Sequence, residues 1–404
     1  MEKRLAVIEI SNREVRLIIG NVVNDKPVIL YQTSRPVSGL LSHGEIIDFE
    51  TLTQIVSSLA TISDANIKMR FHVSDATIIL PASGLNVFKG DKTTNVVSPT
   101  SIIETIDIQN VLSLVTKEPI PGGNDIIDII PDYFITETKK YTEPPIGEKS
   151  NFLRLRCKVY TLPNRIVEQY RDVVQRAGIR AKRIFVAPYG IIELAKQSNE
   201  FPKDYFLVDM GAQTSTISLV GNQSLFGSVG FTLGGDDLIK FVADEMQIST
   251  DEARELVEFH GINERELTFK PVIAKTIING VQVSYGPDDL NRIIVDFFRD
   301  YYFKQFDVVL GQISGTYSTD NLSTLPIVFT GGFSRLHGFD KLAKEKFAQN
   351  QSIHYLEPEA IGARSPSYSA LVGALLASSK YKGSLSDQRA RVSQVERVET
   401  KQQE

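Results

Sequence analysis

The sequence predicts an α/β protein made of two similar halves that face each other across a cleft. Its 404 residues exceed the size at which a single hydrophobic core stops growing, so two or more domains are expected. An apolar strand hairpin that begins near residue 5 is echoed by a second hairpin near residue 205. Around these hairpins, strand patterns alternate with helical ones, as in layered α/β domains. The repeated hairpin suggests the two halves and the cleft between them.

The composition is that of an ordinary globular protein and excludes several classes of function. Hydrophobic residues make up 42% and charged residues 23% of the chain. The 44 basic and 49 acidic residues give a net charge of -5, with no basic block to follow a phosphodiester backbone, so nucleic acid is not an expected partner. No window reaches the roughly 18 consecutive apolar residues of a transmembrane helix. The amino-terminal segment, interrupted by Glu9, predicts neither a signal peptide nor an anchor.

The single cysteine and the histidines suggest no redox or transition-metal chemistry. Cys157 lies in an alternating, strand-like run between Arg156 and Lys158. We interpret it as a core thiol in a reducing compartment; a thiol activated by its basic neighbours is the alternative. The five histidines are scattered without a pair at ligand spacing, so we expect no transition-metal site.

The first half of the chain predicts a layered domain followed by an insertion. Residues 1–83 combine an antiparallel strand meander with an amphipathic helix that begins at Asp48. Residues 84–163 differ from their surroundings and predict a small α+β insertion that returns to the parent domain at Pro163. The expected strands of this half are 4–10, 15–20, 27–37, 71–83, 125–138 and 152–162, and its expected helices are 47–66 and 100–118.

The second half begins with a periodic helix at 164–178 that Gly178 closes in a left-handed conformation. Thr250 is the expected cap and Gly261 the expected end of a helix, and the chain from 251 to 304 is expected to be largely helical. The small-residue helix at 365–378 suits close packing at a hinge between domains. The other expected elements are a strand at 183–188, a helix at 189–197, the hairpin at 206–223, a long helix at 287–313, and a buried strand, Gly-Gly turn and helix at 325–347.

The hairpin "FLVDMGAQTSTISLVGNQ" carries the clearest candidate site. A turn that exposes successive backbone N–H groups can bind an anion when small residues let it approach, as Gly211 and Ala212 do here. Asp209 ends the first strand and can hold Mg²⁺ through water, and Thr214 can add a hydroxyl hydrogen bond. The alternative interpretation is an ordinary hairpin with an Asx-type turn.

Three further stretches fit a nucleotide site less specifically. In the opening hairpin Glu9 takes the carboxylate position, but "SNRE" brings a bulky Arg13 and an acidic Glu14 to the turn. Two glycine pairs stand at helix starts or strand ends, where a phosphate, a base or a ribose can approach closely. These pairs are Gly234 with Gly235 and Gly331 with Gly332. For each pair, a simple turn is the alternative interpretation.

Taken in order, these motifs resemble the actin, heat-shock chaperone and sugar-kinase superfamily, and within it the FtsA branch. The resemblance spans residues 4 to about 380. It is carried by "VIEISNREVRLIIG", "SGLLSHGEIIDFETL", "IIDIIPDYFI", "VAPYGIIELA", "FLVDMGAQTSTISLV", "VGFTLGGDDLI", "IVFTGGFSRLHGF" and "PSYSALVGALL". The insertion after residue 83 lies where FtsA-like proteins carry their extra subdomain. PilM proteins of pilus assembly share that arrangement, whereas the "SHGEII" segment is closer to FtsA.

The resemblance implies an actin-like, ribonuclease H-like duplicated fold with two lobes around a nucleotide cleft. It also implies an FtsA-type inserted subdomain and a filament-forming scaffold of the bacterial division septum. Such a protein is cytoplasmic, peripheral to the membrane, and binds the FtsZ carboxy-terminal tail, copies of itself and other division proteins. The implied divisions are a first lobe of 1–83 completed by 164–190 and 359–383, an insertion of 84–163, a second lobe of 191–244 and 310–358, a helical subdomain of 245–309, and a disordered tail of 384–404.

Carried over residue by residue, the resemblance implies a site for ATP and Mg²⁺. Asp209 would hold the metal through water. The implied nucleotide-binding residues are Glu9, Ser11 and Asn12 on the first hairpin, Asp209, Gly211, Ala212 and Thr214 on the second, Gly234 and Gly235 at the following helix start, and Gly331, Gly332 and Phe333 in the adenosine motif.

Several positions depart from the pattern of the family. Glu14 replaces a usual Lys, Gln213 a usual Gly, Thr216 a usual acid, and Val257 a usual Lys. Each lost charge-assisted bond is worth about 1.5–3 kcal/mol, so we expect weaker phosphate binding and weak or no hydrolysis. The thin stripe of Val392, Val395 and Val398 is too small for firm membrane binding, so attachment is either lost or supplied by a partner.

Three functions therefore remain open from the sequence. The first is an FtsA-like scaffold whose Arg292, Arg299 and Lys304 contact an acidic peptide, although solvated surface charge also explains these cations. The second is an active ATPase or phosphotransferase, which needs a general-base carboxylate in the cleft. The third is a PilM-like pilus or secretion adaptor that binds a short peptide.

Overall fold

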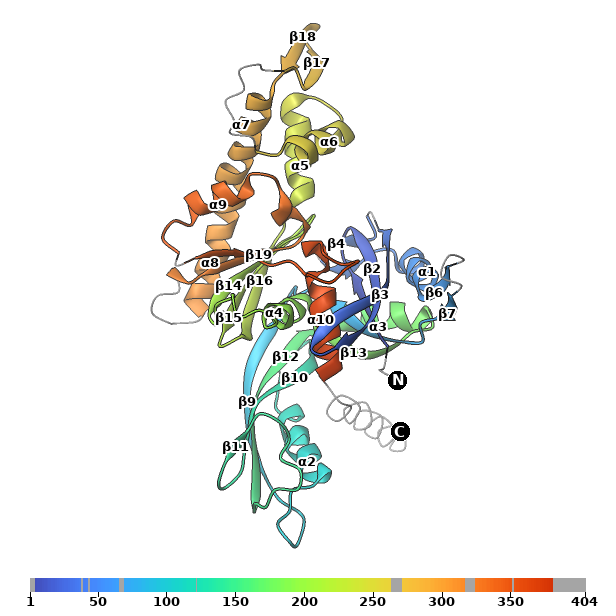
Figure 1. Ribbon diagram of the computed structural model, residues 1–404, viewed down its shortest axis with the longest axis vertical. Coiled ribbons are helices and arrows are strands. Elements are labelled where there is room, and N and C mark those ends of the chain that lie inside the picture. The colour runs from blue at the N-terminus through green and yellow to red at the C-terminus, as the bar shows by residue number, and fades with distance from the viewer. Residues whose placement is uncertain are drawn as a thin grey trace.

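The computed structural model describes residues 4–37, 39–42, 44–64, 69–120, 122–262, 271–316, 324–350 and 352–380. It contains two five-stranded sheets with the same topology, one in each lobe (Figure 1). The strand order is β3-β2-β1-β8-β13 in one sheet and β16-β15-β14-β19-β20 in the other. In both sheets three antiparallel strands are followed by two parallel ones. The duplicated two-lobed α/β fold expected from the sequence is confirmed.

The first lobe packs three helices on its sheet. α1 begins as the sequence indicates, because the Asp48 side chain accepts a hydrogen bond from the Thr51 amide at 3.0 Å. Gly178 follows α3 at φ 79°, the left-handed conformation expected of it. The elements of this lobe are β1 (Leu5–Ile10), β2 (Glu14–Val23), β3 (Lys26–Pro36), β4 (Leu41–Ser42), β5 (Glu45–Ile46), α1 (Phe49–Ala60), β6 (Thr61–Asp64), β7 (Met69–His72), β8 (Asp75–Leu80), α3 (Asn164–Arg176), β13 (Arg180–Val186) and α10 (Ser369–Lys380).

Residues 86–163 form a separate four-stranded sheet with one helix on it, at the lower end of the molecule in Figure 1. α2 begins only at Thr105, because the Asp107 side chain accepts from the Glu104 amide and fixes the start of the helix there, five residues later than expected. The two layers enclose a core of their own. The elements are β9 (Asn86–Asn95), α2 (Thr105–Thr116), β10 (Asn124–Ile135), β11 (Lys140–Tyr141) and β12 (Phe152–Pro163).

Cys157 lies in this core and is 1% exposed. Burial raises the pKa of its thiol to about 12, so the thiolate is scarcely populated at neutral pH. The interpretation as a core thiol is confirmed. We expect no reaction with a thiol reagent such as 5,5′-dithiobis(2-nitrobenzoic acid) in the native protein and one equivalent in denaturant. Rapid labelling of the native protein at pH 7 would contradict this burial.

The second lobe repeats the first with a different set of helices. Its hairpin of β14 and β15 is the segment singled out in the sequence, and its third antiparallel strand is β16. The Gly-Gly stretch after β19 opens a single 3₁₀ turn, and the next α-helix begins only at Phe339. The elements are α4 (Ala187–Ala195), β14 (Tyr205–Met210), β15 (Ser215–Gly221), β16 (Ser224–Phe231), β19 (Ile327–Thr330), α9 (Phe339–Lys346) and β20 (Ile353–Tyr355).

A mainly helical part extends from the second lobe at the top of Figure 1. The cap of its α6 is Ser249, whose side chain accepts from the Glu252 amide at 3.2 Å; Thr250, expected as the cap, is the first helical residue. Gly261 ends this helix as expected, at φ 55°. The expected helical stretch also contains a two-stranded hairpin, and its long helix is interrupted by a π-helical turn, Phe298–Tyr302. The elements are α5 (Gly235–Met246), α6 (Thr250–His260), β17 (Ala274–Ile278), β18 (Val281–Tyr285), α7 (Pro287–Phe297) and α8 (Phe303–Thr316).

Two small-residue helices, α4 and α10, cross where the lobes meet. A Cβ atom placed on Gly373 would lie 1.7 Å from the Gly190 carbonyl oxygen, so the two backbones are in direct contact. At its two ends α10 is tied to equivalent strands of the two sheets. Ser378 bonds Thr77 of β8 and Ser369 bonds Thr330 of β19, both at 2.8 Å. The close packing expected of this helix is what the structure shows.

Within the described ranges, no helix is both long and apolar enough to cross a membrane. The expected disordered tail, 384–404, with its stripe of Val392, Val395 and Val398, lies outside the described residues.

Candidate functional site

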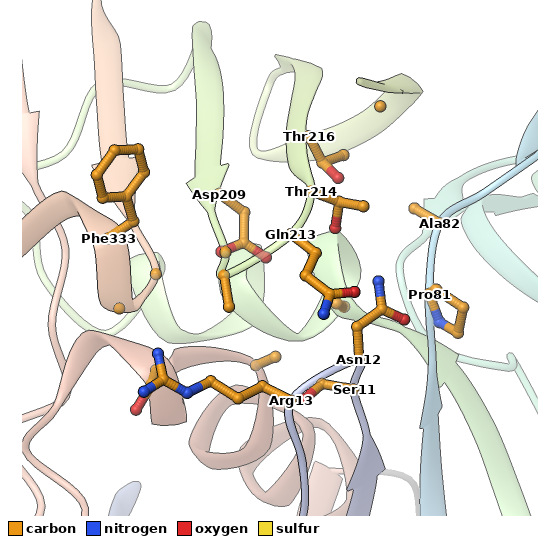
Figure 2. A pocket seen from close by; sticks show the side chains of 18 of the residues that line it. Ser11, Asn12, Arg13, Pro81, Ala82, Asp209, Gln213, Thr214, Thr216 and Phe333 are labelled. Carbon is orange, nitrogen blue, oxygen red and sulfur yellow. The ribbon is translucent and has the colours of Figure 1, made fainter. Parts of the chain in front are cut away.

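A cavity of 1320 Å³ lies between the two lobes and is lined by every motif singled out for chemistry (Figure 2). The turn between β1 and β2 enters it from the first lobe, and the turn between β14 and β15 enters it from the second. The start of α5 and the segment after β19 complete the lining on the side of the second lobe. The cleft expected from the repeated hairpin is therefore present.

The two hairpin turns have the same backbone geometry. The Ser11 amide donates to the Glu14 carbonyl at 3.1 Å, and the Gly211 amide donates to the Thr214 carbonyl at 3.0 Å. Figure 2 shows Asn12 and Gln213 projecting toward one another from the two turns. A Cβ atom on Gly211 would lie 2.7 Å from the Thr214 carbonyl oxygen, so this turn requires glycine.

The second turn presents backbone N–H groups to the cavity. Among the described residues, the amides of Ala212, Gln213 and Thr214 donate to no protein acceptor. All three residues are partly exposed and line the cavity. Consecutive free amides of this kind form an anion-binding concavity. The turn therefore fits a phosphate, although the side chain of Gln213 stands at its tip.

Asp209 is a carboxylate without a partner in the described part of the chain. No hydrogen bond or ion pair reaches its oxygens, although protein encloses it on most sides. Burial raises its pKa to about 7, the Glu9 carboxylate adds to the rise, and Arg16 opposes it. An enclosed carboxylate in this condition is a good ligand for a hydrated cation, because the cation would supply the missing positive charge.

Glu9 is placed differently from Asp209, although both line the cavity. Arg16 donates to the Glu9 carboxylate at 3.0 Å and also to Glu14 and to the Ser367 carbonyl. Burial nevertheless raises the pKa of Glu9, with Arg16 opposing the rise. Because Glu9 already has a cationic partner, it is poorly placed to act as a general base.

The start of α5 packs directly on the second hairpin. The amides of Gly235 and Asp236 donate to the carbonyls of Gly211 and Ala212, at 3.1 and 2.8 Å. A Cβ atom on Gly234 would lie 2.4 Å from the Ala212 carbonyl oxygen, so the close contact requires glycine there. The first amides of this helix are thus used by the protein itself and do not point at a ligand.

In the last motif, glycine is required by the backbone, and the aromatic side chain belongs to the core. Gly331 has φ 89°, and a Cβ atom on it would lie 2.5 Å from an Asp209 side-chain oxygen. Phe333 is 9% exposed, and its ring stacks on Phe298 with centroids 5.5 Å apart. A Cβ atom on Gly235 would lie 3.4 Å from the Phe333 ring, which therefore supports the start of α5. Gly332 lines the cavity and is exposed.

Among the lining residues that were not selected from the sequence, Arg13, Arg254 and Tyr170 carry polar groups that bear on the chemistry of the site. Arg13 extends along the cavity from the first turn in Figure 2, although the sequence suggested only that it was too bulky. Arg254 on α6 and Tyr170 on α3 also line the cavity, and each has a buried polar atom without a hydrogen-bond partner. The resemblance leads one to expect a cation at position 257 of α6, where this chain has Val257. Arg254 lies three residues earlier on the same helix, so the sequence contained a signal for a cation there.

Arg292, Arg299 and Lys304 lie on the long helix outside the cavity. Each of these cations is paired with Asp296 or Asp300 of the same helix. All three side chains are more than 60% exposed. An acidic peptide would have to compete with these local pairs, which individually contribute little to stability.

The fold is actin-like: two lobes of one topology each contribute a hairpin turn to the cavity between them. Known structures agree. The fold is similar to that of a chain of the PilM–PilN type IV pilus biogenesis complex, with TM-score 0.59, 16% identity and coverage of 94% of this chain and 99% of that one. It is also similar to MreB 5 of Spiroplasma citri bound to AMPPNP, with TM-score 0.51, 11% identity and coverage of 92% and 95%.

In sequence, the chain is similar to FtsA cell-division proteins. It is 24% identical to cell division protein FtsA of Streptococcus pneumoniae over 367 residues, which is 90% of this chain and 78% of that protein. It is 23% identical to FtsA of Bacillus subtilis over 370 residues, covering 91% and 81%. No family model matches the chain.

Proposed function

We propose that this chain is an actin-like scaffold of bacterial cell division that binds a magnesium nucleotide in its cleft without hydrolysing it. The observation that carries the proposal is its similarity to FtsA proteins over about nine-tenths of its length. In this proposal the scaffold lies at the cytoplasmic face of the membrane, binds the FtsZ tail, and assembles with copies of itself and other division proteins.

The chemistry of the cleft supports nucleotide binding. The free amides of the second turn fit a phosphate group, and the unpartnered Asp209 fits a hydrated Mg²⁺. When bound, the metal supplies positive charge between this carboxylate and the phosphates. Gly211, Gly234 and Gly331 keep the surrounding backbone close enough to shape the site.

The same residues argue against hydrolysis. Activation of a water needs a free carboxylate at the phosphate site. Among the hairpin positions, Glu9 is paired with Arg16, and Thr216 stands where the family usually has an acid. Asp209 is the carboxylate assigned to the metal. We therefore propose that the nucleotide is a structural ligand that holds the two lobes together.

The test of nucleotide binding is calorimetry with Mg·ATP and Mg·ADP, together with phosphate-release measurements. We expect binding that is lost in Asp209→Ala, and phosphate release no faster from the natural protein than from this variant. Phosphate release that Asp209→Ala abolishes would identify an ATPase and overturn the non-hydrolytic role.

A PilM-like adaptor is the second candidate, because the PilM–PilN complex contains a chain of similar fold over 94% of this protein. Binding of the purified protein to a peptide of the FtsZ carboxy-terminal tail and to PilN peptides separates the two. We expect saturable binding of the FtsZ peptide only. Binding of a PilN peptide alone would replace the division role with the adaptor role.

A further inference from the structure

We propose that Arg13 and Arg254 hold the phosphates of the nucleotide and that Asp236 occupies both arginines when no nucleotide is bound. This inference rests on the proposed nucleotide site. The two arginines would replace the lysines that the family usually has at the positions of Glu14 and Val257. The ligand class is a nucleotide with at least two phosphates, since a single carboxylate, that of Asp236, leaves most donors of the two guanidinium groups unused.

The two arginines come from opposite sides of the cleft and reach the same oxygen. Arg13 belongs to the first hairpin turn, and its Nη1 lies 3.8 Å from Asp236 Oδ1. Arg254 belongs to α6, and its Nη2 lies 3.3 Å from that oxygen. Asp236 itself stands in the first turn of α5. One carboxylate therefore bridges the lobes through two cations.

Neither arginine is satisfied by this arrangement. Arg254 Nη1 is buried and has no hydrogen-bond partner. The Arg13 side chain is 50% exposed, and its distance to Asp236 is too long for a hydrogen bond. A guanidinium group has five N–H donors in a rigid fork, and Asp236 accepts a hydrogen bond from only one of them, at Arg254 Nη2.

Side chains must supply the phosphate contacts on this side of the cavity. The amides of Gly235 and Asp236 already donate to the second hairpin, so the start of α5 offers no free N–H groups at these positions. The free amides of Ala212, Gln213 and Thr214 belong to the hairpin that α5 packs on. Both arginines line the cavity with that hairpin. Their guanidinium groups match phosphate oxygens in geometry and charge.

The Asp236 carboxylate competes with a phosphate for the two arginines. It neutralises two cations in the free protein and would repel a phosphate that approaches them. Binding therefore exchanges the Arg13–Asp236 pair, which crosses the cleft, for a phosphate that contacts both lobes. Removing the competitor should strengthen binding, and removing either arginine should weaken it.

The test is calorimetry at one low ionic strength with Mg·ATP, Mg·ADP and sodium tripolyphosphate, plus adenosine as a ligand without phosphate. We expect Arg13→Gln and Arg254→Gln each to weaken binding of the three phosphate ligands by about tenfold or more. Asp236→Asn should strengthen it several-fold. Arg13→Lys should recover part of the loss, and adenosine binding should not change. Arg35→Gln, which removes an exposed arginine bonded only within its own strand, is the matched control.

The outcomes separate this inference from the proposed function. If the natural protein binds nucleotide and both arginine variants bind it equally well, the inference is overturned and the nucleotide site stands. If the natural protein binds no nucleotide, the proposed ligand is wrong. Binding of tripolyphosphate to Asp236→Asn then tests whether the two arginines form a phosphate site that Asp236 masks. Binding gained in Asp236→Asn and lost again in its combination with Arg13→Gln supports the masked site, and no gain overturns it. Thermal melting of every variant shows that it is folded.

Discussion

Replacing Asp209 with Asn should raise the stability of the ligand-free protein, most strongly above pH 7. The Asp209 carboxyl has a pKa of about 7 in the folded protein because of burial and the nearby Glu9, against about 3.9 in an unfolded chain. Asn is nearly isosteric and cannot ionise. The substitution should therefore remove the cost of holding an unpartnered negative charge in the cleft.

The direction of the pH dependence follows from the raised pKa. Below about pH 4 the carboxyl is protonated in both states and carries no penalty. As the pH rises from 4 to 7, the unfolded chain loses a proton that the folded chain retains, so the free energy of unfolding falls. The shift corresponds to a loss of at most about 4 kcal/mol, complete above pH 7. Asp209→Asn should lack this loss and be more stable than the natural protein by about 2–4 kcal/mol at pH 8.

Urea unfolding of both proteins at pH 5, 6, 7 and 8 measures the effect. Asp75→Asn is the control with the opposite sign, because a hydrogen bond from Arg180 lowers the pKa of Asp75. That variant should be less stable than the natural protein, and the difference should stay constant from pH 5 to pH 8, because the lowered pKa of Asp75 lies below this range. Equal stability of Asp209→Asn and the natural protein at pH 8 would mean that the carboxylate is not penalised in the cleft.

Replacing Gly373 with Ala should destabilise the protein more than any surface substitution, by about 3 kcal/mol or more. The new methyl group would lie 1.7 Å from the Gly190 carbonyl oxygen, so α4 and α10 would have to separate. Backbone cannot move aside as a flexible side chain can. Because α10 is bonded to Thr77 of one sheet and Thr330 of the other, the displacement should also loosen the junction of the lobes.

Gly311→Ala is the matched control for this prediction. Gly311 lies in α8, where an added Cβ atom would meet nothing within 4 Å. Alanine there should stabilise the helix by about 1 kcal/mol, because glycine loses more backbone entropy on folding. Thermal or urea unfolding compares the two variants. If Gly373→Ala unfolds at the same urea concentration as the natural protein, the backbones of α4 and α10 are not in the direct contact described above.

The sequence by itself determined the features that depend on a few neighbouring residues. The start of α1 at Asp48 and the left-handed Gly178 follow from local hydrogen bonds and local sterics. The two hairpins follow from apolar alternation along each strand, and their repetition indicated the duplicated fold. The hairpin β17–β18 was missed because its strands are short and lie between strongly helical segments.

Only the tertiary structure decided the chemistry of the cleft, because charge and hydrogen bonding there depend on residues far apart in the chain. Glu9 and Asp209 hold equivalent places in the two hairpins, yet Arg16 pairs with one and no described residue pairs with the other. Phe333, expected beside adenosine, lines the cavity, and its ring also packs on Phe298 and Tyr302 of the π turn, which the sequence did not indicate. Arg13 seemed only an obstacle in the sequence. The approach of the second lobe gives it Asp236 as a partner and makes it a candidate ligand for phosphate.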